Sequence, residues 1–321
     1  MSFSSEVKEE LSRQLSPARH CRIAELAALL NVCGQVEISE DDSCAVILHT
    51  ENISVARKYF TLLKKTFNIE AVIRVRKNAC LKKSNVYLAE VTSHSDTVRI
   101  LQAVKLMTGD QELVENQGTA DPLVIQSSCC RRAFLRGMFL AAGSISDPEK
   151  SYHLEIVCSG QERALQVQQV LREFEVDARI VNRKKNQVVY IKEGSQIADF
   201  LRLTEAGISL MKLENIRILK EISNNVNRQV NCETANINKT VSAAVKQIED
   251  IRYIATHMGF SQLSEGLEEM AVLRLKYPDA TLKELGQMLH PPVGKSGVNH
   301  RLRKLSRIAG ELRGDKEDYY D

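Results

Sequence analysis

Tryptophan is absent from this 321-residue sequence, and aromatic residues make up only 5% of it. This scarcity argues against a protein that binds single-stranded nucleic acid by stacking bases on aromatic side chains. The sequence also lacks an apolar run long enough to cross a membrane, and its first ten residues are polar and acidic rather than typical of a signal peptide. We therefore expect a cytoplasmic protein without a membrane partner.

The cysteines lack the spacing of a familiar metal motif. No two of the eight cysteines form a CxxC pair, and none lies at zinc-finger spacing from a histidine; they are Cys21, Cys33, Cys44, Cys80, Cys129, Cys130, Cys158 and Cys232. Scattered thiols without an export signal are typical of a reducing compartment. This pattern predicts no structural zinc site, and we expect no cofactor.

An internal repeat is the main feature that the sequence does contain. The segment LRGMFLAAG, from Leu135 to Gly143, follows LAALLNVCG, from Leu26 to Gly34, at a constant offset of 109 residues. A repeat at this distance indicates a duplicated domain half rather than a short solenoid repeat.

Hydrophobic periodicity gives both halves the same order of elements, αββαββα. After a polar helix at 5–15, the first half has helices at 22–33, 53–67 and 95–106, with strands at 36–38, 45–48, 71–75 and 86–91. A linker at 109–126 precedes the second half, with helices at 131–142, 162–174 and 194–203 and strands at 144–146, 153–158, 178–181 and 187–191. Gly34 is expected to end the first core helix as its C-cap.

After residue 203 the pattern is entirely helical. Two long helices are expected at 206–226 and 237–257, separated by a polar stretch in which Asn231 and Asn236 could cap the second helix, and a three-helix pattern follows at 261–312. The predicted fold class is therefore α+β: a duplicated αββαββα domain followed by an all-α helix-turn-helix domain. The predicted boundaries are 1–205 (halves 1–108 and 127–205), a helical linker at 206–257, a DNA-binding domain at 258–314 and an acidic tail at 315–321.

The paired motif helices and their αββαββα context resemble the LAGLIDADG homing-endonuclease fold. In that family two such helices pack closely through small residues, represented here by Gly137 and Ala28. The eighth motif position carries the family's metal-binding acid, but here these positions hold Cys33 and Ala142. A thiol and a methyl group cannot supply the oxygen ligands that Mg²⁺ prefers. We expect no catalytic residue and no metal at this site.

The C-terminal sequence has the features of a helix-turn-helix, which we expect to run from Thr281 to Gly314. Thr281 and Glu284 form a capping box, and the segment 290–294, HPPVG, breaks the chain before a helix that begins near Lys295. Val298, Leu302, Leu305 and Ile308 mark the buried face of that helix. The motif contains seven Lys or Arg and two acidic residues, so it carries +5 whereas the whole chain carries +3. Such a concentration of positive charge is typical of phosphate binding.

The position of each polar side chain on the last helix suggests a division of labour. Early residues are best placed to read base edges, namely Ser296, Asn299, His300 and Arg303. The other basic residues suit phosphate contacts, namely Lys295, Arg301, Lys304, Arg307 and Arg313. A basic helix that is merely solvated is the plain alternative.

Three blocks together resemble the WhiA family of bacterial regulators: SFSSEVKEEL at 2–11, NRQVNCETANINKT at 227–240, and TLKELGQML with KSGVNHRLRKL from Thr281. The resemblance implies sequence-specific transcription control in Gram-positive bacteria, linked to sporulation, cell division or chromosome segregation. It implies double-stranded DNA as partner, with other transcription regulators or RNA polymerase as further candidates, and a nucleoid-associated location. Two alternatives remain: a Mg²⁺-dependent nuclease using the displaced acids Glu37 and Asp147, and an N-terminal scaffold that binds a protein or a small ligand.

Overall fold

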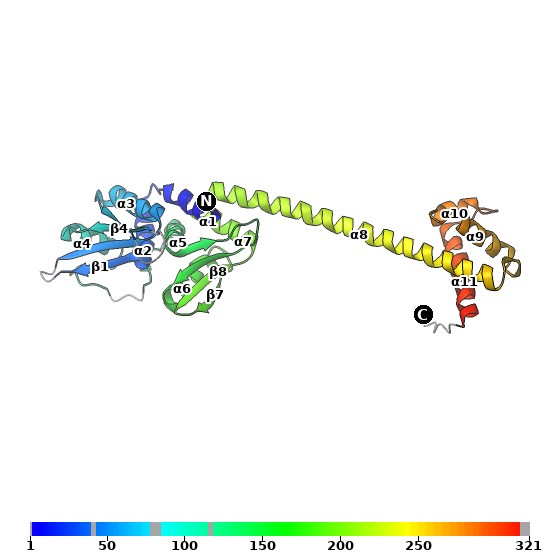
Figure 1. The fold of residues 1–321 in the computed structure, drawn as a ribbon. Helices are drawn as coiled ribbons and strands as arrows, with labels where there is room; N and C mark the ends of the chain where they lie inside the picture. Colours follow the sequence, from blue (N-terminus) through cyan, green and yellow to red (C-terminus); the bar gives the residue numbers. More distant parts are fainter. Residues whose placement is uncertain (1, 40–42, 78–84, 115–117, 315–321) are drawn as a thin grey trace. The chain divides into compact units, whose positions relative to one another are not determined.

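The computed structural model describes residues 2–39, 43–77, 85–114 and 118–314 (Figure 1). These residues form two compact units that divide between Glu221 and Ile222. Cys80 and the acidic tail at 315–321 lie outside the described residues.

The N-terminal unit contains both copies of the repeat. The first copy runs α2 (Arg19–Cys33), β1 (Gly34–Ile38), β2 (Cys44–Thr50), α3 (Ile53–Phe67), β3 (Val72–Lys77), β4 (Asn85–Val91) and α4 (His94–Ala103). The second runs α5 (Ser128–Ala142), β5 (Gly143–Ile145), β6 (Leu154–Cys158), α6 (Gln161–Arg172), β7 (Arg179–Arg183), β8 (Asn186–Ile191) and α7 (Gly194–Thr204). The predicted order αββαββα is confirmed in both halves.

Each half builds one four-stranded antiparallel sheet. The strand orders are β1-β2-β4-β3 and β5-β6-β8-β7, so the two sheets have the same topology. Alternation sets their buried face: Cys44, Val46 and Leu48 are buried in β2 and the residues between them are only partly covered. If β2 paired with its neighbours one residue out of register, these apolar side chains would turn towards solvent. The alternation therefore also specifies the register of the sheet.

Helices α2 and α5 pack side by side at the centre of the N-terminal unit (Figure 1). A Cβ atom added to Gly137 would lie 2.6 Å from the Glu25 carbonyl oxygen and 2.7 Å from the Ala28 Cβ. The predicted close approach through small residues is therefore confirmed. Gly34 is the C-cap of α2, as predicted: its backbone is extended, with φ of −83°, and its N–H donates to the Leu30 carbonyl. Glycine is required there because a Cβ would overlap the Leu30 carbonyl oxygen.

Two segments that the sequence suggests are peripheral pack against this core. Helix α1 (Phe3–Arg13) is amphipathic, and it buries Phe3, Val7 and Leu11. The connection at 109–126 is fixed near Ala120, whose N–H donates to Gln166 Oε1 at 2.9 Å and whose carbonyl accepts from Gln166 Nε2 at 2.7 Å. The described part of the connection around Ala120 therefore packs against the second half.

One helix replaces the two long helices that the sequence predicts. Helix α8 (Gly207–His257) runs for 51 residues without a break. Asn231 and Asn236 lie inside it, so the predicted capping role is wrong. The segment 228–236 contains neither proline nor glycine, and its polar groups bond along the helix: Thr240 Oγ1 donates to the Asn236 carbonyl at 2.9 Å. Among the described residues no helix combines the length and the apolar character needed to span a membrane.

The C-terminal unit is a small helical domain with its own core. After α8 come a 3₁₀ turn (Phe260–Gln262), α9 (Glu265–Lys276), α10 (Leu282–Met288) and α11 (Lys295–Arg313). Every one of these four α-helices contributes buried residues to the core: Ile251, Ile254, Leu267, Met270, Ala271, Leu285, Val298, Leu302, Leu305 and Ala309. The predicted all-α fold with a helix-turn-helix is confirmed.

Candidate nucleic-acid interface

Helix α10 begins with the capping box that the sequence predicts. The Glu284 N–H donates to Thr281 Oγ1 at 3.3 Å, and the Thr281 N–H donates to Glu284 Oε2 at 2.7 Å. These hydrogen bonds satisfy two backbone donors that would otherwise lack partners at the start of a helix. The bond from the Thr281 backbone also lowers the pKa of Glu284, because it favours the charged carboxylate.

The turn between α10 and α11 depends on a close backbone approach. The Val293 N–H donates to the Gly286 carbonyl at 2.8 Å, so the chain folds directly back over α10. A Cβ at Gly286 would overlap the Val293 carbonyl oxygen, and one at Gly297 would overlap the Val293 side chain. Glycine at both positions therefore lets the two helices meet across a short turn.

A regular apolar stripe fixes the orientation of α11. Val298, Leu302, Leu305 and Ala309 are buried at helical spacing, whereas Ile308 is only partly buried. Ile308 packs against the core while partly exposed, and Ala309 next to it is fully covered. The opposite face is solvated because burying its charged groups would cost far more than leaving them in water.

Helix α11 ends at Arg313, directly before Gly314, the last residue of the predicted helix-turn-helix. Gly314 follows as the C-cap with φ of 79°, a left-handed conformation that glycine adopts without steric cost, and its N–H donates to the Glu311 carbonyl at 3.2 Å. Gly314 therefore closes the last turn of the helix, and it has no side chain to offer to DNA.

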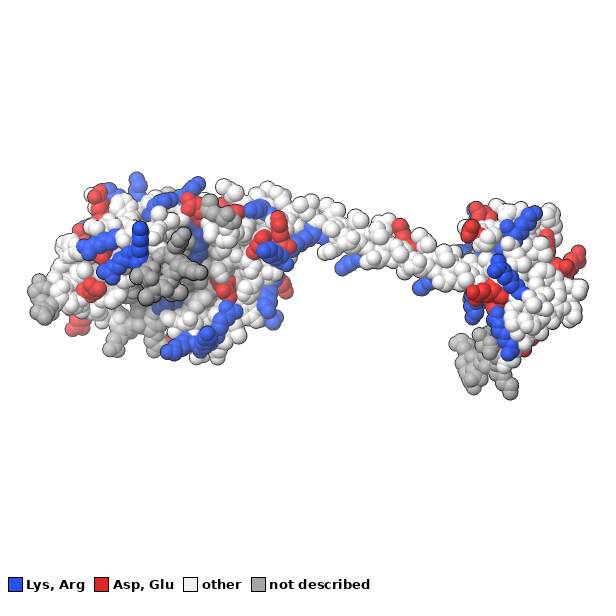
Figure 2. All heavy atoms as spheres, viewed as in Figure 1, with Lys and Arg blue, Asp and Glu red and all other residues white. Residues whose placement is uncertain are grey.

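The nine residues predicted to contact DNA differ in their exposure. Asn299 and Arg301 are half-buried, and the other seven are exposed: Lys295, Ser296, His300, Arg303, Lys304, Arg307 and Arg313. Exposed side chains at Lys295 and Ser296 place polar groups at the helix N-terminus, which attracts phosphate. Figure 2 shows that basic and acidic side chains are interspersed on both units, so the view reveals no uniformly positive face.

Two of the arginines that we predict to contact phosphates also interact with other residues of the C-terminal unit. Arg301 Nη1 donates to the Gly266 carbonyl at 3.3 Å, which ties α11 to α9. Arg313 Nη1 lies 2.7 Å from Asp250 Oδ1, and its guanidinium lies 4.6 Å from the Tyr253 ring centre, which ties α11 to α8. The role of these residues in DNA binding stays a prediction.

The degenerate motif positions Cys33 and Ala142 lie at the C-terminal ends of α2 and α5. Cations interact with the Cys33 thiol, namely Lys8 and Arg163, and burial raises the pKa of Cys33 to about 11. Positive charge at this place is unfavourable for a second cation. The displaced acid Asp147 is exposed and accepts from the Glu149 N–H at 3.1 Å, so it stabilises a turn.

A buried ionic network, which sequence reasoning missed, joins the two halves. Glu25 Oε1 on α2 lies 3.0 Å from Lys58 Nζ on α3 and 3.1 Å from Arg136 Nε on α5. Arg136 also donates to Ser16 Oγ at 3.0 Å and lies 2.8 Å from Glu205 Oε2. Burial lowers the pKa of Lys58, and Glu25 partly offsets this effect. The helical spacing of polar residues does not predict that Glu25, Lys58 and Arg136 meet.

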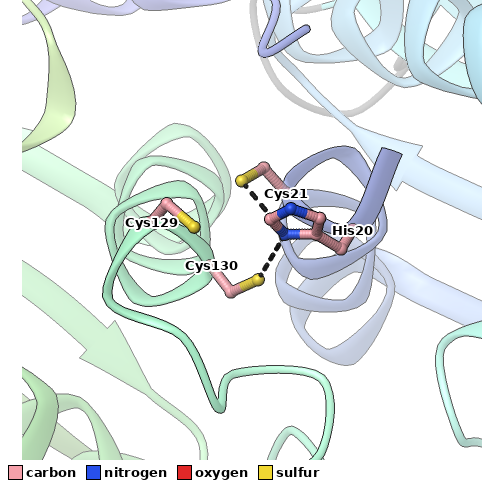
Figure 3. Close-up of side chains that lie close together, drawn as sticks. All are labelled: His20, Cys21, Cys129 and Cys130. Atoms are coloured by element: carbon pink, nitrogen blue, oxygen red, sulfur yellow. Dashed lines mark hydrogen bonds between the residues drawn. The ribbon is translucent and has the colours of Figure 1, made fainter. Parts of the chain in front are cut away.

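A cluster of soft metal ligands also lies between the halves. His20 and Cys21 on α2 face Cys129 and Cys130 on α5 (Figure 3). Their ligand atoms all lie within 4.8 Å of one another. The spacing rules missed it because the two pairs are 109 residues apart, although the repeat itself aligns Cys21 with Cys130.

Comparisons with known proteins agree with this architecture. Three family models match: the WhiA N-terminal LAGLIDADG-like domain at residues 19–107, the WhiA LAGLIDADG-like domain at 131–223 and the WhiA C-terminal HTH domain at 226–309. The probable cell division protein WhiA of Lachnoclostridium phytofermentans is 58% identical over 313 residues, which are 98% of this chain and 100% of that protein. The protein of the same name from Alkaliphilus oremlandii is 47% identical over 317 residues, covering 98% of this chain and 99% of that one.

A solved structure matches along the same length. Full-length DUF199/WhiA from Thermatoga maritima gives a TM-score of 0.59 at 26% identity, covering 97% of this chain and 99% of that one. The matches to whole relatives and to all three family models have the same consequence: this chain belongs to the WhiA family.

Proposed function

We propose that this chain binds double-stranded DNA sequence-specifically through helix α11 and regulates transcription of genes for cell division, with sporulation and chromosome segregation as related roles in Gram-positive bacteria. The observation that carries the proposal is the exposed polar row at the start of α11, which follows the tight turn at Gly286. A helix held in this way can enter the major groove with its first turns against the bases.

Within the proposal, side chains at the start of α11 divide between bases and phosphates. Ser296, Asn299, His300 and Arg303 read base edges, because amide and guanidinium groups match the pattern of donors and acceptors in the major groove. Lys295, Lys304 and Arg307 hold the backbone, together with Arg301 and Arg313. The interactions of Arg301 with Gly266 and of Arg313 with Asp250 support a positioning role for these two residues as well.

The test compares two neighbouring exposed residues of α11. After selection of a preferred duplex from a random pool, binding is measured on that duplex and on a scrambled one over a range of salt concentrations. Arg303→Ala should cost about 1–3 kcal/mol on the preferred duplex and little on the scrambled one. Lys304→Ala should weaken both and reduce the slope of log K against log salt by about 0.9, as expected for one lost phosphate contact.

A matched control is Lys239→Ala, which removes an exposed lysine from the middle of α8 and should leave both affinities unchanged. Equal losses for Arg303→Ala and Lys304→Ala on the two duplexes would overturn the division between base and phosphate contacts. Failure of the random pool to yield any preferred duplex would overturn sequence-specific binding itself.

The proposal treats the N-terminal unit as a scaffold without nuclease activity. The eighth motif positions hold Cys33 and Ala142 instead of acids, and Lys8 and Arg163 add positive charge beside Cys33. Glu37 on β1 and Asp147 in its turn are both exposed, as ordinary surface acids are. Plasmid cleavage in the presence of Mg²⁺ that Asp147→Ala abolishes would contradict this part of the proposal.

A further inference from the structure

The cluster at the N-terminal ends of α2 and α5 has the composition of a metal site. Cys130 Sγ lies 3.1 Å from His20 Nδ1, and Cys21 Sγ lies 3.5 Å from the same nitrogen (Figure 3). Cys129 interacts with both Cys21 and Cys130. The four ligand atoms therefore converge from two helices, with Cys21 and Cys130 buried and His20 and Cys129 exposed.

The geometry is close to that of a tetrahedral zinc site. Three cysteine sulfurs and one histidine nitrogen form a donor set typical of structural zinc. With metal–sulfur bonds of about 2.3 Å, neighbouring sulfurs of a tetrahedron lie about 3.8 Å apart. Ligand atoms that already lie within 4.8 Å of one another reach this spacing by small side-chain rotations.

The repeat explains why the four ligands meet. His20 and Cys21 occupy the second and third positions of α2, and Cys129 and Cys130 occupy the same positions of α5. The offset of 109 residues superimposes His20 on Cys129 and Cys21 on Cys130. Because the two helices pack against each other along their length, equivalent positions near their starts face one another, and each half supplies two ligands.

The two helix starts and the neighbouring arginines would stabilise thiolates that a bound metal ion creates. Neither α2 nor α5 has a side-chain N-cap or an acidic residue in its first turn, so these two helix starts lack the usual negative partner. Thiolates bound to a metal ion there would supply it. Arg19 and Arg22 directly flank His20 and Cys21 in the sequence, and Arg131 and Arg132 follow Cys130. Their positive charge favours the net charge of −1 that Zn²⁺ with three thiolates would carry.

We propose that His20, Cys21, Cys129 and Cys130 bind one Zn²⁺ ion, which clamps the starts of the two central helices together. Binding converts three neutral thiols into thiolates, releases three protons to water and leaves the imidazole neutral, with Nδ1 on the metal. The ion has no open coordination position in this arrangement, so its role is structural. It stabilises the junction between the halves, at the opposite end of α2 and α5 from the degenerate positions Cys33 and Ala142.

Metal analysis of the full-length chain tests the proposal. The protein is purified without a histidine tag under reducing conditions, and its metal content is measured by plasma mass spectrometry. We expect about one zinc per chain, and Co²⁺ substitution should give the intense visible bands of a tetrahedral, thiolate-rich site. A chelator strong enough to remove zinc should lower the melting temperature of the N-terminal unit.

Two exposed ligands allow the site to be broken with little effect on the core. Cys129→Ser and His20→Ala should each lower zinc content well below one per chain, abolish the visible cobalt bands and remove the effect of the chelator on melting. Cys232→Ser is the matched control, because it removes an exposed cysteine of α8 and should leave one zinc in place.

Three outcomes would overturn the proposal. The first is a properly folded, reduced chain that contains no zinc and gives no cobalt bands on titration. The second is a metal signal that persists in both Cys129→Ser and His20→Ala. The third is a disulfide among Cys21, Cys129 and Cys130 in the chain as isolated from cells, detected by mass spectrometry, which would point to a redox role instead.

Discussion

Glu25 lies between two buried cations, and its neutralisation should destabilise the N-terminal unit more than the loss of either cation. Glu25→Gln preserves the shape of the side chain but leaves Lys58 and Arg136 buried beside each other; none of these side chains is more than 1% exposed. Removing one partner of a buried ion pair costs about 3–5 kcal/mol. Since domains are typically stable by about 5–15 kcal/mol, this change would remove a large share of the free energy of unfolding.

The other two members of the network should be less sensitive. Lys58→Met leaves Glu25 paired with Arg136, and Arg136→Met leaves it paired with Lys58, so neither variant buries an unpaired charge of Glu25. Arg136→Met also removes the donor to Ser16 Oγ. We therefore expect both methionine variants to lose less stability than Glu25→Gln.

Urea unfolding of the full-length chain, followed by circular dichroism and tyrosine fluorescence, measures these differences. The transition of the C-terminal unit, which contains none of the three residues, serves as an internal reference. Arg202→Met is the control, because it removes an exposed ion pair with Asp199 and should cost at most about 1 kcal/mol. The reasoning would be refuted if either methionine variant were as unstable as Glu25→Gln.

Four further predictions concern backbone packing and capping. Gly286→Ala should destabilise the C-terminal unit by about 1–3 kcal/mol and abolish DNA binding, because the new Cβ overlaps a carbonyl across the turn; Gly294→Ala, in open space, should not, and melting curves distinguish them. Thr281→Ala should cost about 1 kcal/mol in the same assay. The pKa of Glu284 is lowered in the folded state, so its stabilising effect is complete above the ordinary glutamate pKa and disappears as pH falls through the lowered value; Glu284→Gln should flatten this part of an acid denaturation curve. Gly137→Ala should destabilise the N-terminal unit by about 1–3 kcal/mol in urea, whereas an unchanged midpoint would contradict the close approach of α2 and α5.

Local patterns predict most of the fold because the forces that set it are local. Alternation in β2 and β6 and helical spacing in α3 and α11 follow from which side chains reach the core. The capping box at Thr281 is likewise confined to four neighbouring residues, so sequence alone reveals it. The error at α8 has a local cause as well: asparagines favour caps, but without glycine or proline the helix continues through them.

The interior chemistry of the N-terminal unit could not be predicted in the same way. Glu25 and Arg136 meet because α2 and α5 pack closely, and no rule based on neighbours in the sequence couples residues 111 positions apart. The cluster at His20 and Cys21 is a similar case, although combining the repeat with helix pairing would have brought Cys21 and Cys130 together. For α11, the sequence predicts which side chains are exposed, but not that Arg313 binds Asp250.

The buried ionic network also affects which halves of the duplicated N-terminal unit can pair with each other. At the offset of 109, Glu25 corresponds to Phe134 and Arg136 corresponds to Ala27, so the ionic contact is present in one direction only. Two N-terminal halves associating through α2 would bury each Glu25 without its arginine, and two C-terminal halves would leave each Arg136 with Glu205 but without the buried carboxylate of Glu25. The differences at these positions therefore favour the pairing of one half with the other over the pairing of two identical halves.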